Sequence, residues 1–278
     1  MSIKKIIYGV VFLITSLVAS ENENKVVSFI KSNSNSNVES ITVKKSVEVD
    51  ENWKAYLIEI KVNKVEYPIE EIFISDGTYI TQGIFDIEKN QNLRDIAFSK
   101  LHPTFNQSFY KKENLVFGKE NAKNKLVVFT DPFCPNCIEY INNDLFSNKN
   151  ILTKKDIAIY FYSIPIVDVF GANEVLIKAI ILYKLENKTT YDADKRLYTA
   201  LINNNNFTLA RKDQKSALNF FNDEFKTKFS LKDLEKKEVV EIYNNNINIS
   251  KELRIKGTPT VFYNSYIDIT RTKFLEKE

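Results

Sequence analysis

The sequence Val127-Val128-Phe129-Thr130-Asp131-Pro132-Phe133-Cys134-Pro135-Asn136-Cys137 decides the fold class of this chain. It opens with an apolar, β-branched run of the kind that forms a buried strand. A helical pattern follows over residues 138–146, and a second buried strand is predicted over residues 157–162. Strand, helix and strand in this order make a βαβ unit with a right-handed crossover. The two cysteines therefore lie where a strand gives way to a helix.

The predicted position of Cys134 suits a nucleophilic thiol. At the N-terminus of a helix, free backbone N–H groups and the positive end of the helix dipole stabilise a thiolate. Pro135 fits the first helical turn, where its missing N–H costs nothing. Cys137 lies one turn further on, from where it can attack a mixed disulfide and release a substrate. The spacing predicts Cys134 as nucleophile and Cys137 as resolving thiol, with Pro135 and Asn136 tuning the pair.

The composition weakens the other interpretations of a C-x-x-C pair. The chain has 2 Cys and 1 His, too few for a zinc site of the usual Cys/His kind. His102, the one partner for a Cys–His hydrolase, precedes Pro103 in a polar connecting stretch. A structural disulfide would more usually close a longer loop. The pair is interpreted as a redox-active disulfide, Cys134-Cys137, that requires no metal and no other cofactor.

Gly257-Thr258-Pro259 is the second element of the predicted site. A proline that opens an apolar strand is unusual unless it serves an edge or a turn. In the thioredoxin fold, a cis-proline loop lies beside the nucleophilic cysteine and presents backbone groups to the substrate. By spacing alone, an ordinary trans proline in a loop is an equal alternative. Combined with the C-x-x-C pair, the sequence favours Thr258 and Pro259 as substrate-binding residues.

Residues 1–20 are predicted to be a cleaved export signal. Lys4 and Lys5 give a basic start, residues 6–14 give an apolar core, and Val18-Ala19-Ser20 supplies small residues for cleavage. The alternative is an uncleaved anchor, for which the apolar run is short. Removal of the two lysines leaves a near-neutral protein, which gives no electrostatic argument for nucleic-acid binding.

The rest of the chain divides into a small N-terminal domain and a larger C-terminal domain. Residues 21–90 contain an amphipathic stretch and several β-branched runs, with a hairpin turn at Asp76-Gly77 and a returning strand over residues 78–87. This pattern predicts an α+β unit on an antiparallel sheet. Residues 91–120 are predicted to be a linker with helical parts. Residues 121–278 form the catalytic domain, with a helical insertion at about residues 171–254.

Three stretches resemble a known family. Val128-Phe129-Thr130-Asp131 leading into Cys134-Pro135-Asn136-Cys137, together with Gly257-Thr258-Pro259-Thr260, resembles the bacterial periplasmic thiol:disulfide interchange proteins of the DsbC/DsbG type, in the thioredoxin superfamily. Residues 72–83 look like the hairpin of that family's N-terminal dimerisation domain. The resemblance implies an α/β thioredoxin-like domain with a long helical insertion, preceded by a small α+β (cystatin-like) N-terminal domain. It also implies a periplasmic homodimer with Pro259 in cis.

The same resemblance implies a disulfide isomerase or reductase that acts on unfolded or misoxidised exported proteins. Such an enzyme is kept reduced by a membrane reductant of the DsbD type, and Thr258 matches the isomerase pattern. Pro135-Asn136 departs from it and favours the alternative, a DsbA-type oxidase kept oxidised by a DsbB-type partner. A third alternative is a periplasmic chaperone or peptide-binding module. Val128 replaces the buried acid of thioredoxins, so the proton acceptor for Cys137 is left open.

Overall fold

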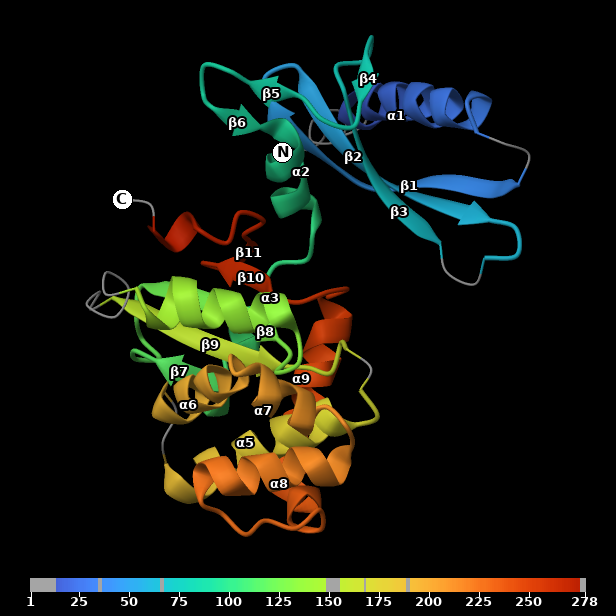
Figure 1. The fold of residues 1–278 in the computed structure, drawn as a ribbon. Coiled ribbons are helices and arrows are strands. Elements are labelled where there is room, and N and C mark those ends of the chain that lie inside the picture. Colours follow the sequence, from blue (N-terminus) through green and yellow to red (C-terminus); the bar gives the residue numbers. More distant parts are fainter. Residues whose placement is uncertain are drawn as a thin grey trace, which may run out of the picture. The chain divides into compact units, whose positions relative to one another are not determined.

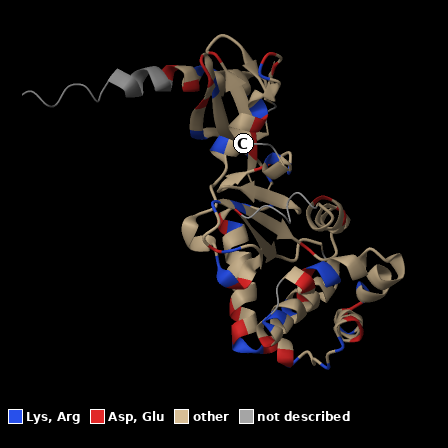
Figure 2. Ribbon diagram, turned by 90° about the vertical axis from the view of Figure 1, so that its left-hand side faces the viewer, with Lys and Arg blue, Asp and Glu red and all other residues tan. Residues whose placement is uncertain are grey.

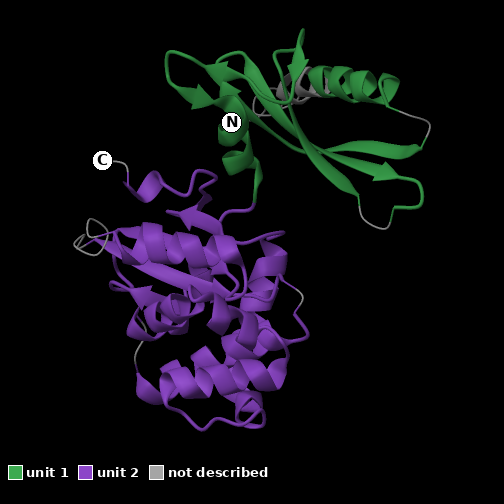
Figure 3. Cartoon of the chain, viewed as in Figure 1, with its two compact units in different colours: residues 1–102 green, residues 103–278 purple. Residues whose placement is uncertain are grey.

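The computed structural model divides the chain into two compact units, residues 1–102 and residues 103–278 (Figure 3). The structure describes residues 14–34, 37–65, 68–148, 156–167, 169–188 and 191–275. The division after His102 falls inside the segment of residues 91–120 that is predicted to be a linker. Each unit has its own sheet and its own buried core, and each is described by itself.

The predicted signal peptide, residues 1–20, lies largely outside the described residues. Helix α1 (Ile14–Ser32) begins within it and continues past the predicted cleavage point after Ser20. Farther along this helix, the side chains of Val26 and Ile30 are buried against the first sheet. Among the described residues, no helix combines the length and the apolar character needed to cross a membrane.

The first unit is built on an antiparallel sheet in the order β1-β2-β3-β4 (Figure 1). Its strands are β1 (Val38–Asp50), β2 (Trp53–Val62), β3 (Ile69–Ser75) and β4 (Ile80–Thr81). Successive side chains of a strand point to opposite sides of the sheet. In the middle of β2 both sets of side chains are buried, each in a different core. Tyr56 and Ile58 pack against α1, while Ala55 and Leu57 pack against helix α2 (Leu93–Leu101).

The returning strand of the predicted hairpin is shorter than expected. Strand β4 pairs two residues with the end of β3, whereas the prediction extends this strand over residues 78–87. The Asp76 carboxylate accepts hydrogen bonds from the backbone amides two and three residues further on, which stabilises a turn in place of a ladder. The chain then forms a small hairpin between β5 (Phe85–Asp86) and β6 (Gln91–Asn92).

The second unit is built on a five-stranded sheet in the order β11-β10-β8-β9-β7. Its strands are β7 (Leu115–Phe117), β8 (Asn124–Thr130), β9 (Ile157–Ser163), β10 (Thr260–Tyr263) and β11 (Tyr266–Ile267). Strands β8 and β9 are parallel, and the other neighbours are antiparallel. The predicted βαβ unit is thus present. Its crossover runs through helix α3 (Pro135–Glu139) and the π-helical segment η3 (Tyr140–Phe146).

Both faces of this sheet are covered, which explains why residues 126–129 of β8 form a continuous apolar run. Val128 and Phe161 belong to the large core that the sheet shares with the helices. Phe129 and Tyr162 point to the other face, where they pack against Phe105 at ring-centroid distances of 6.2 and 5.3 Å. The strand that leads into the cysteines is therefore held from two sides, which fixes the start of α3.

Helices fill the segment between β9 and β10, where the insertion is predicted. They are α5 (Ala172–Asn187), α6 (Tyr191–Leu201), α7 (Asn204–Ala210), α8 (Gln214–Phe225) and α9 (Lys237–Glu252). Their buried side chains form one core with one face of the sheet. Basic and acidic residues are interspersed along these helices (Figure 2).

We predict that Gly118→Ala destabilises the second unit by about 2 kcal/mol. Gly118 follows β7 with φ +83°, and an added Cβ would lie 2.0 Å from the Ile157 carbonyl oxygen. Urea denaturation followed by circular dichroism measures the effect. Gly83→Ala is the matched control, because an added Cβ there meets nothing within 4 Å. Equal stabilities of the two variants would contradict the close approach of β7 to β9.

Candidate active site

A tight turn after β8 places Cys134 at the start of a helix. The backbone N–H of Cys134 donates to the Asp131 carbonyl at 3.0 Å, and the N–H of Phe133 donates to Asp131 Oδ1 at 2.9 Å. Cys134 is the N-cap residue of α3 and Pro135 occupies its first turn. The sequence folds this way because proline needs no hydrogen bond at that position and aspartate readily caps a turn.

The structure brings the cysteine pair and the proline loop together. Cys134 Sγ donates to the Thr258 carbonyl oxygen at 3.2 Å, across a separation of 124 residues. The Thr258–Pro259 peptide bond is cis, as the resemblance implies. The contact follows from sheet register, because Thr260 at the start of β10 pairs with Phe129 near the end of β8.

The two thiols differ in exposure. Both cysteines are free, so this is the dithiol form. Cys134 retains 7% of its surface exposed, whereas Cys137 is completely buried. Between them, Pro135 and Asn136 are exposed. A substrate disulfide can therefore meet Cys134 and this exposed rim, while Cys137 lies beneath them.

Hydrogen bonding lowers the pKa of Cys134 to about 6. The largest contribution is the hydrogen bond from the Cys137 thiol, which stabilises the Cys134 thiolate; burial opposes it, and the Thr258 hydroxyl and the Cys137 backbone N–H assist it. Asp131 acts in the opposite direction, because its negative charge disfavours the thiolate. Cys134 is thus an activated thiol at neutral pH.

Burial raises the pKa of Cys137 far above that of an ordinary thiol, and its hydrogen bond to Cys134 raises it further. A thiol that keeps its proton is a poor nucleophile. The asymmetry gives the two cysteines different chemical capabilities. At neutral pH the Cys134 thiol readily loses its proton, whereas the Cys137 thiol retains its proton.

The hydroxyl group of Thr258 is buried without a hydrogen-bond partner among the described residues. It lies close enough to both thiols to lower the pKa of each, yet it lacks hydrogen-bond geometry in this dithiol form. Unpaired buried hydroxyls are costly. A hydrogen bond from the Thr258 hydroxyl to a cysteine thiolate or to a bound substrate chain would therefore be favourable.

Asp131 is a site residue that the sequence predictions missed. Its side chain is completely buried, and Oδ2 accepts from the backbone N–H groups of Ile166 and Val167 at 2.7 and 2.8 Å and from Asn173 Nδ2 at 3.3 Å. The sequence offers one sign of its role, because Asp131 lies between an apolar strand and Pro132. Its partners come from a segment more than thirty residues away, which no local pattern reveals.

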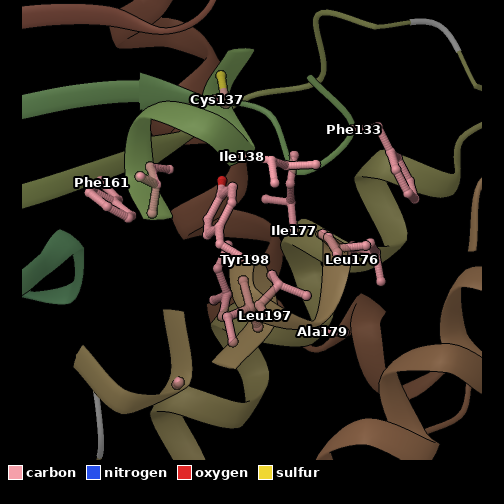
Figure 4. Close-up of a cluster of buried hydrophobic side chains, with 14 of the residues drawn as sticks. Phe133, Cys137, Ile138, Phe161, Leu176, Ile177, Ala179, Leu197 and Tyr198 are labelled. Carbon is pink, nitrogen blue, oxygen red and sulfur yellow. The ribbon is translucent and has the colours of Figure 1, made fainter. Parts of the chain in front are cut away.

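A buried hydroxyl pair lies beneath Cys137. Thr130 Oγ1 and the Tyr198 hydroxyl are 2.8 Å apart, and Figure 4 shows the Tyr198 oxygen directed toward the helix that carries Cys137. Thr130 lowers the pKa of Cys137, which identifies it as a neighbour of that thiol. The ring of Tyr198 belongs to the large core of the second unit. No sequence pattern indicates that its hydroxyl lies at the site, because helix α6 reaches the site only in the folded chain.

The helical insertion also contacts the active-site helix through hydrogen bonds. Asn142 lies in the π-helical segment η3, and its Nδ2 donates to the carbonyl oxygens of Ile138 and Tyr198 at 2.8 and 3.0 Å. The Thr199 hydroxyl donates to Asn142 Oδ1 at 3.1 Å. Asn142 joins the Ile138 carbonyl of α3 to the Tyr198 carbonyl of α6 through one side-chain amide. The insertion is thus an integral support of α3.

A groove runs between the active-site helix and the insertion, beginning at Pro135. Its volume is about 360 Å³. The residues that line it are Pro135, Ile138, Glu139, Asn142, Asn143, Leu201, Ile202, Asn204 and Phe207. Ile202 is 56% exposed at its edge. The groove offers an apolar surface with polar margins that begins one residue after Cys134.

Within the described part of the chain, no group of three or more His, Cys, Asp or Glu side chains is arranged to hold a metal ion. The chemistry available at this site is that of two thiols with unequal acidity. These can exchange electrons with a disulfide through sulfur alone.

The sheet order, the C-x-x-C pair at the start of a helix and the cis-proline loop define a thioredoxin-like α/β protein. The family described as "Thioredoxin-like domain" matches residues 111–265, more than half of the chain. The chain belongs to this family. The predicted fold class is confirmed, with a helical insertion in this domain and a small α+β unit before it.

The chain is similar to several solved structures. ScsC of Proteus mirabilis in a compact conformation is 21% identical with a TM-score of 0.44, over 58% of this chain and 74% of that chain. Oxidised BdbD of Bacillus subtilis is 15% identical with a TM-score of 0.43, over 62% and 91%. The thiol-disulfide exchange protein alpha-DsbA2 of Wolbachia pipientis is 18% identical with a TM-score of 0.39, over 58% and 81%. The comparison with curated proteins gave no match.

We predict that alkylation of the reduced protein is confined to Cys134 and follows a midpoint at about pH 6. Because the thiolate reacts, the rate rises as pH increases through this value, about tenfold from pH 5 to pH 8. Stopped-flow reaction with iodoacetamide and mass spectrometry would measure both rate and position. A midpoint near that of a free thiol would contradict the proposed activation.

Cys137→Ala should move this midpoint upward by about one pH unit or more, because it removes the thiol hydrogen bond that contributes most to the low pKa of Cys134. Cys137→Ser is the matched control, since its hydroxyl can still donate. An ultraviolet thiolate titration of both variants and of the unaltered protein tests the point. Equal midpoints in the alanine variant and the unaltered protein would exclude Cys137 as the donor.

Proposed function

We propose that this chain is a thiol–disulfide oxidoreductase that acts through Cys134 and Cys137. The Cys134 thiolate attacks one sulfur of a substrate disulfide, forms a mixed disulfide and releases the other sulfur as a thiolate, which takes up a proton. Cys137 then loses its proton and attacks Cys134 Sγ. The Cys134-Cys137 disulfide forms, and the substrate leaves as a dithiol. Run in reverse, the same steps introduce a disulfide.

One observation carries this proposal: the contact at 3.2 Å between Cys134 Sγ and the Thr258 carbonyl, beside a cis proline and above a buried second thiol. It supports Cys134 as nucleophile, Cys137 as resolving thiol and the Thr258–Pro259 loop as the surface that meets the substrate backbone. Pro135 and Asn136 are the exposed residues between the two cysteines, and in this proposal they tune the pair. The redox centre is the disulfide itself, without another cofactor.

The first candidate activity is that of a disulfide isomerase or reductase for misoxidised exported proteins. It rests on Thr258 before the cis proline and on an additional α+β unit of residues 1–102. In this proposal the enzyme is periplasmic, forms a homodimer through its N-terminal unit as in the DsbC/DsbG type, and is kept reduced by a membrane reductant of the DsbD type.

The second candidate activity is that of a disulfide-introducing oxidase. It is favoured by the Pro135-Asn136 dipeptide and by the low pKa of Cys134, about 6. A stabilised thiolate favours the reduced form of the enzyme, so its disulfide is a stronger oxidant. In this case the partner is a DsbB-type oxidant. A binding module in which the thiols are incidental is less compatible with an activated Cys134.

The redox state of the pair in the cell separates these candidates. For an isomerase or reductase, acid quenching and thiol alkylation of the native protein should find Cys134 and Cys137 mostly reduced. A mostly oxidised pair would overturn that candidate and favour the oxidase. Cys134→Ala should abolish disulfide exchange in either case, and retained exchange would refute the whole proposal.

The groove beside Pro135 is proposed to hold a large apolar side chain next to the substrate cysteine. We predict that Ile202→Asp lowers kcat/KM about tenfold for a disulfide-linked peptide with such a side chain. Oxidised glutathione should react unchanged, because it does not enter the groove. Leu209→Asp is the matched control, since Leu209 is 49% exposed in the same part of the insertion but does not line the groove. Equal losses for both variants or both substrates would contradict the assignment.

A further inference from the structure

The Asp131 carboxylate is held by a set of neutral donors. Oδ1 accepts from the Phe133 amide at 2.9 Å, and Oδ2 accepts from the Ile166 and Val167 amides at 2.7 and 2.8 Å and from Asn173 Nδ2 at 3.3 Å. Among the described residues, no lysine or arginine forms an ion pair with Asp131. Amide donors can hold a carboxylate in its charged form, but they do not cancel its charge as a cation would.

The same residue connects two segments that border the nucleophile. Its carbonyl oxygen accepts from the Cys134 amide at 3.0 Å, so its backbone fixes the turn that starts α3. Its side chain fixes the chain that leaves β9 at Ile166 and Val167. Ile166 is 40% exposed, so an apolar side chain lies on the far side of this connection. Asp131 is therefore one of the links between these two segments, beside the backbone hydrogen bond from the Ile164 amide to the Thr130 carbonyl.

We propose that Asp131 is a positioning residue for Cys134: it locks the turn before the nucleophile to the segment after β9 and places one uncompensated negative charge beside the reacting sulfur. This inference rests on the proposed dithiol chemistry and adds to it a residue whose charge opposes the Cys134 thiolate, beside the larger opposing effect of burial. Nucleophilicity falls as a thiol becomes more acidic. A nearby carboxylate thus keeps the Cys134 sulfur more nucleophilic, and its disulfide less oxidising, than the hydrogen bonds alone would make them.

Asp131→Asn tests both parts of this role. Loss of the charge should lower the midpoint of the Cys134 thiolate titration by about 0.3 pH units, because Asp131 has the smallest of the effects on this thiol. The equilibrium with glutathione should shift about twofold toward the reduced enzyme, which corresponds to about 9 mV. In addition, the carboxamide of this variant cannot accept from all four donors, so the Ile166 and Val167 amides should exchange hydrogen faster. The Ile164 amide bonds to the Thr130 carbonyl instead, and its exchange should not change.

Asp268→Asn is the matched control. Asp268 is 1% exposed in the same unit, and its carboxylate accepts from the Thr270 hydroxyl and from the Arg271 and Lys273 amides. This control removes the charge of a buried carboxylate that also accepts from backbone amides but does not affect the pKa of Cys134. The midpoint of the Cys134 thiolate titration should therefore stay unchanged. A midpoint that rises or stays constant in folded Asp131→Asn, or moves equally in Asp268→Asn, would overturn the proposal.

A measurement on the unaltered protein covers the case in which Asp131→Asn does not fold. The Ile166 and Val167 amide resonances should shift with the Cys134 midpoint, about pH 6, because Asp131 links them to the sulfur. Flat resonances across that range would refute the connection. Of these readouts, only the glutathione equilibrium requires disulfide exchange; the thiolate titration, the amide exchange and the amide resonances do not. A negative result in those three would leave disulfide exchange by Cys134 and Cys137 in place, whereas a protein without exchange activity would fail the proposed function alone.

Discussion

The site depends on one contact between distant parts of the chain, the hydrogen bond from Cys134 Sγ to the Thr258 carbonyl. It can form only because β8 and β10 are neighbours in register, so that the end of one strand meets the start of the other. Aromatic packing on one face of the sheet and the shared core on the other hold β8 in place. The fold of the second unit thus serves to bring a helix start and a cis-proline loop to the same point.

Around this contact, burial gives the two thiols opposite properties. Cys134 is stabilised as a thiolate by donors on its own turn, whereas Cys137 keeps its proton because it has no access to water. The helical insertion contributes hydrogen bonds to this arrangement as well as apolar packing. Tyr198 reaches the Thr130 hydroxyl beneath Cys137, and Asn142 fastens η3 to α6. These contacts make the environment of the Cys137 thiol depend on residues far from the C-x-x-C motif.

The parts of the fold that could be predicted were those with a local signal. Strands β8 and β9 have long apolar runs, and the two cysteines and Pro259 have distinctive spacing. Strand β7 was missed, because three residues within a polar stretch give no periodicity. Asp131 and the Tyr198 hydroxyl were missed for a different reason. Their importance comes from partners that are remote in sequence, and only the folded chain reveals them.

The central claim is that Cys134 attacks and Cys137 resolves. It is tested most directly by mixing reduced protein with a defined disulfide-linked peptide and following the sulfur linkages by mass spectrometry. The account predicts a lasting peptide adduct on Cys134 in Cys137→Ala. In the unaltered protein the adduct should be transient and give way to the Cys134-Cys137 disulfide. An adduct on Cys137 in the unaltered protein, or a lasting adduct on Cys134 there, would contradict the account.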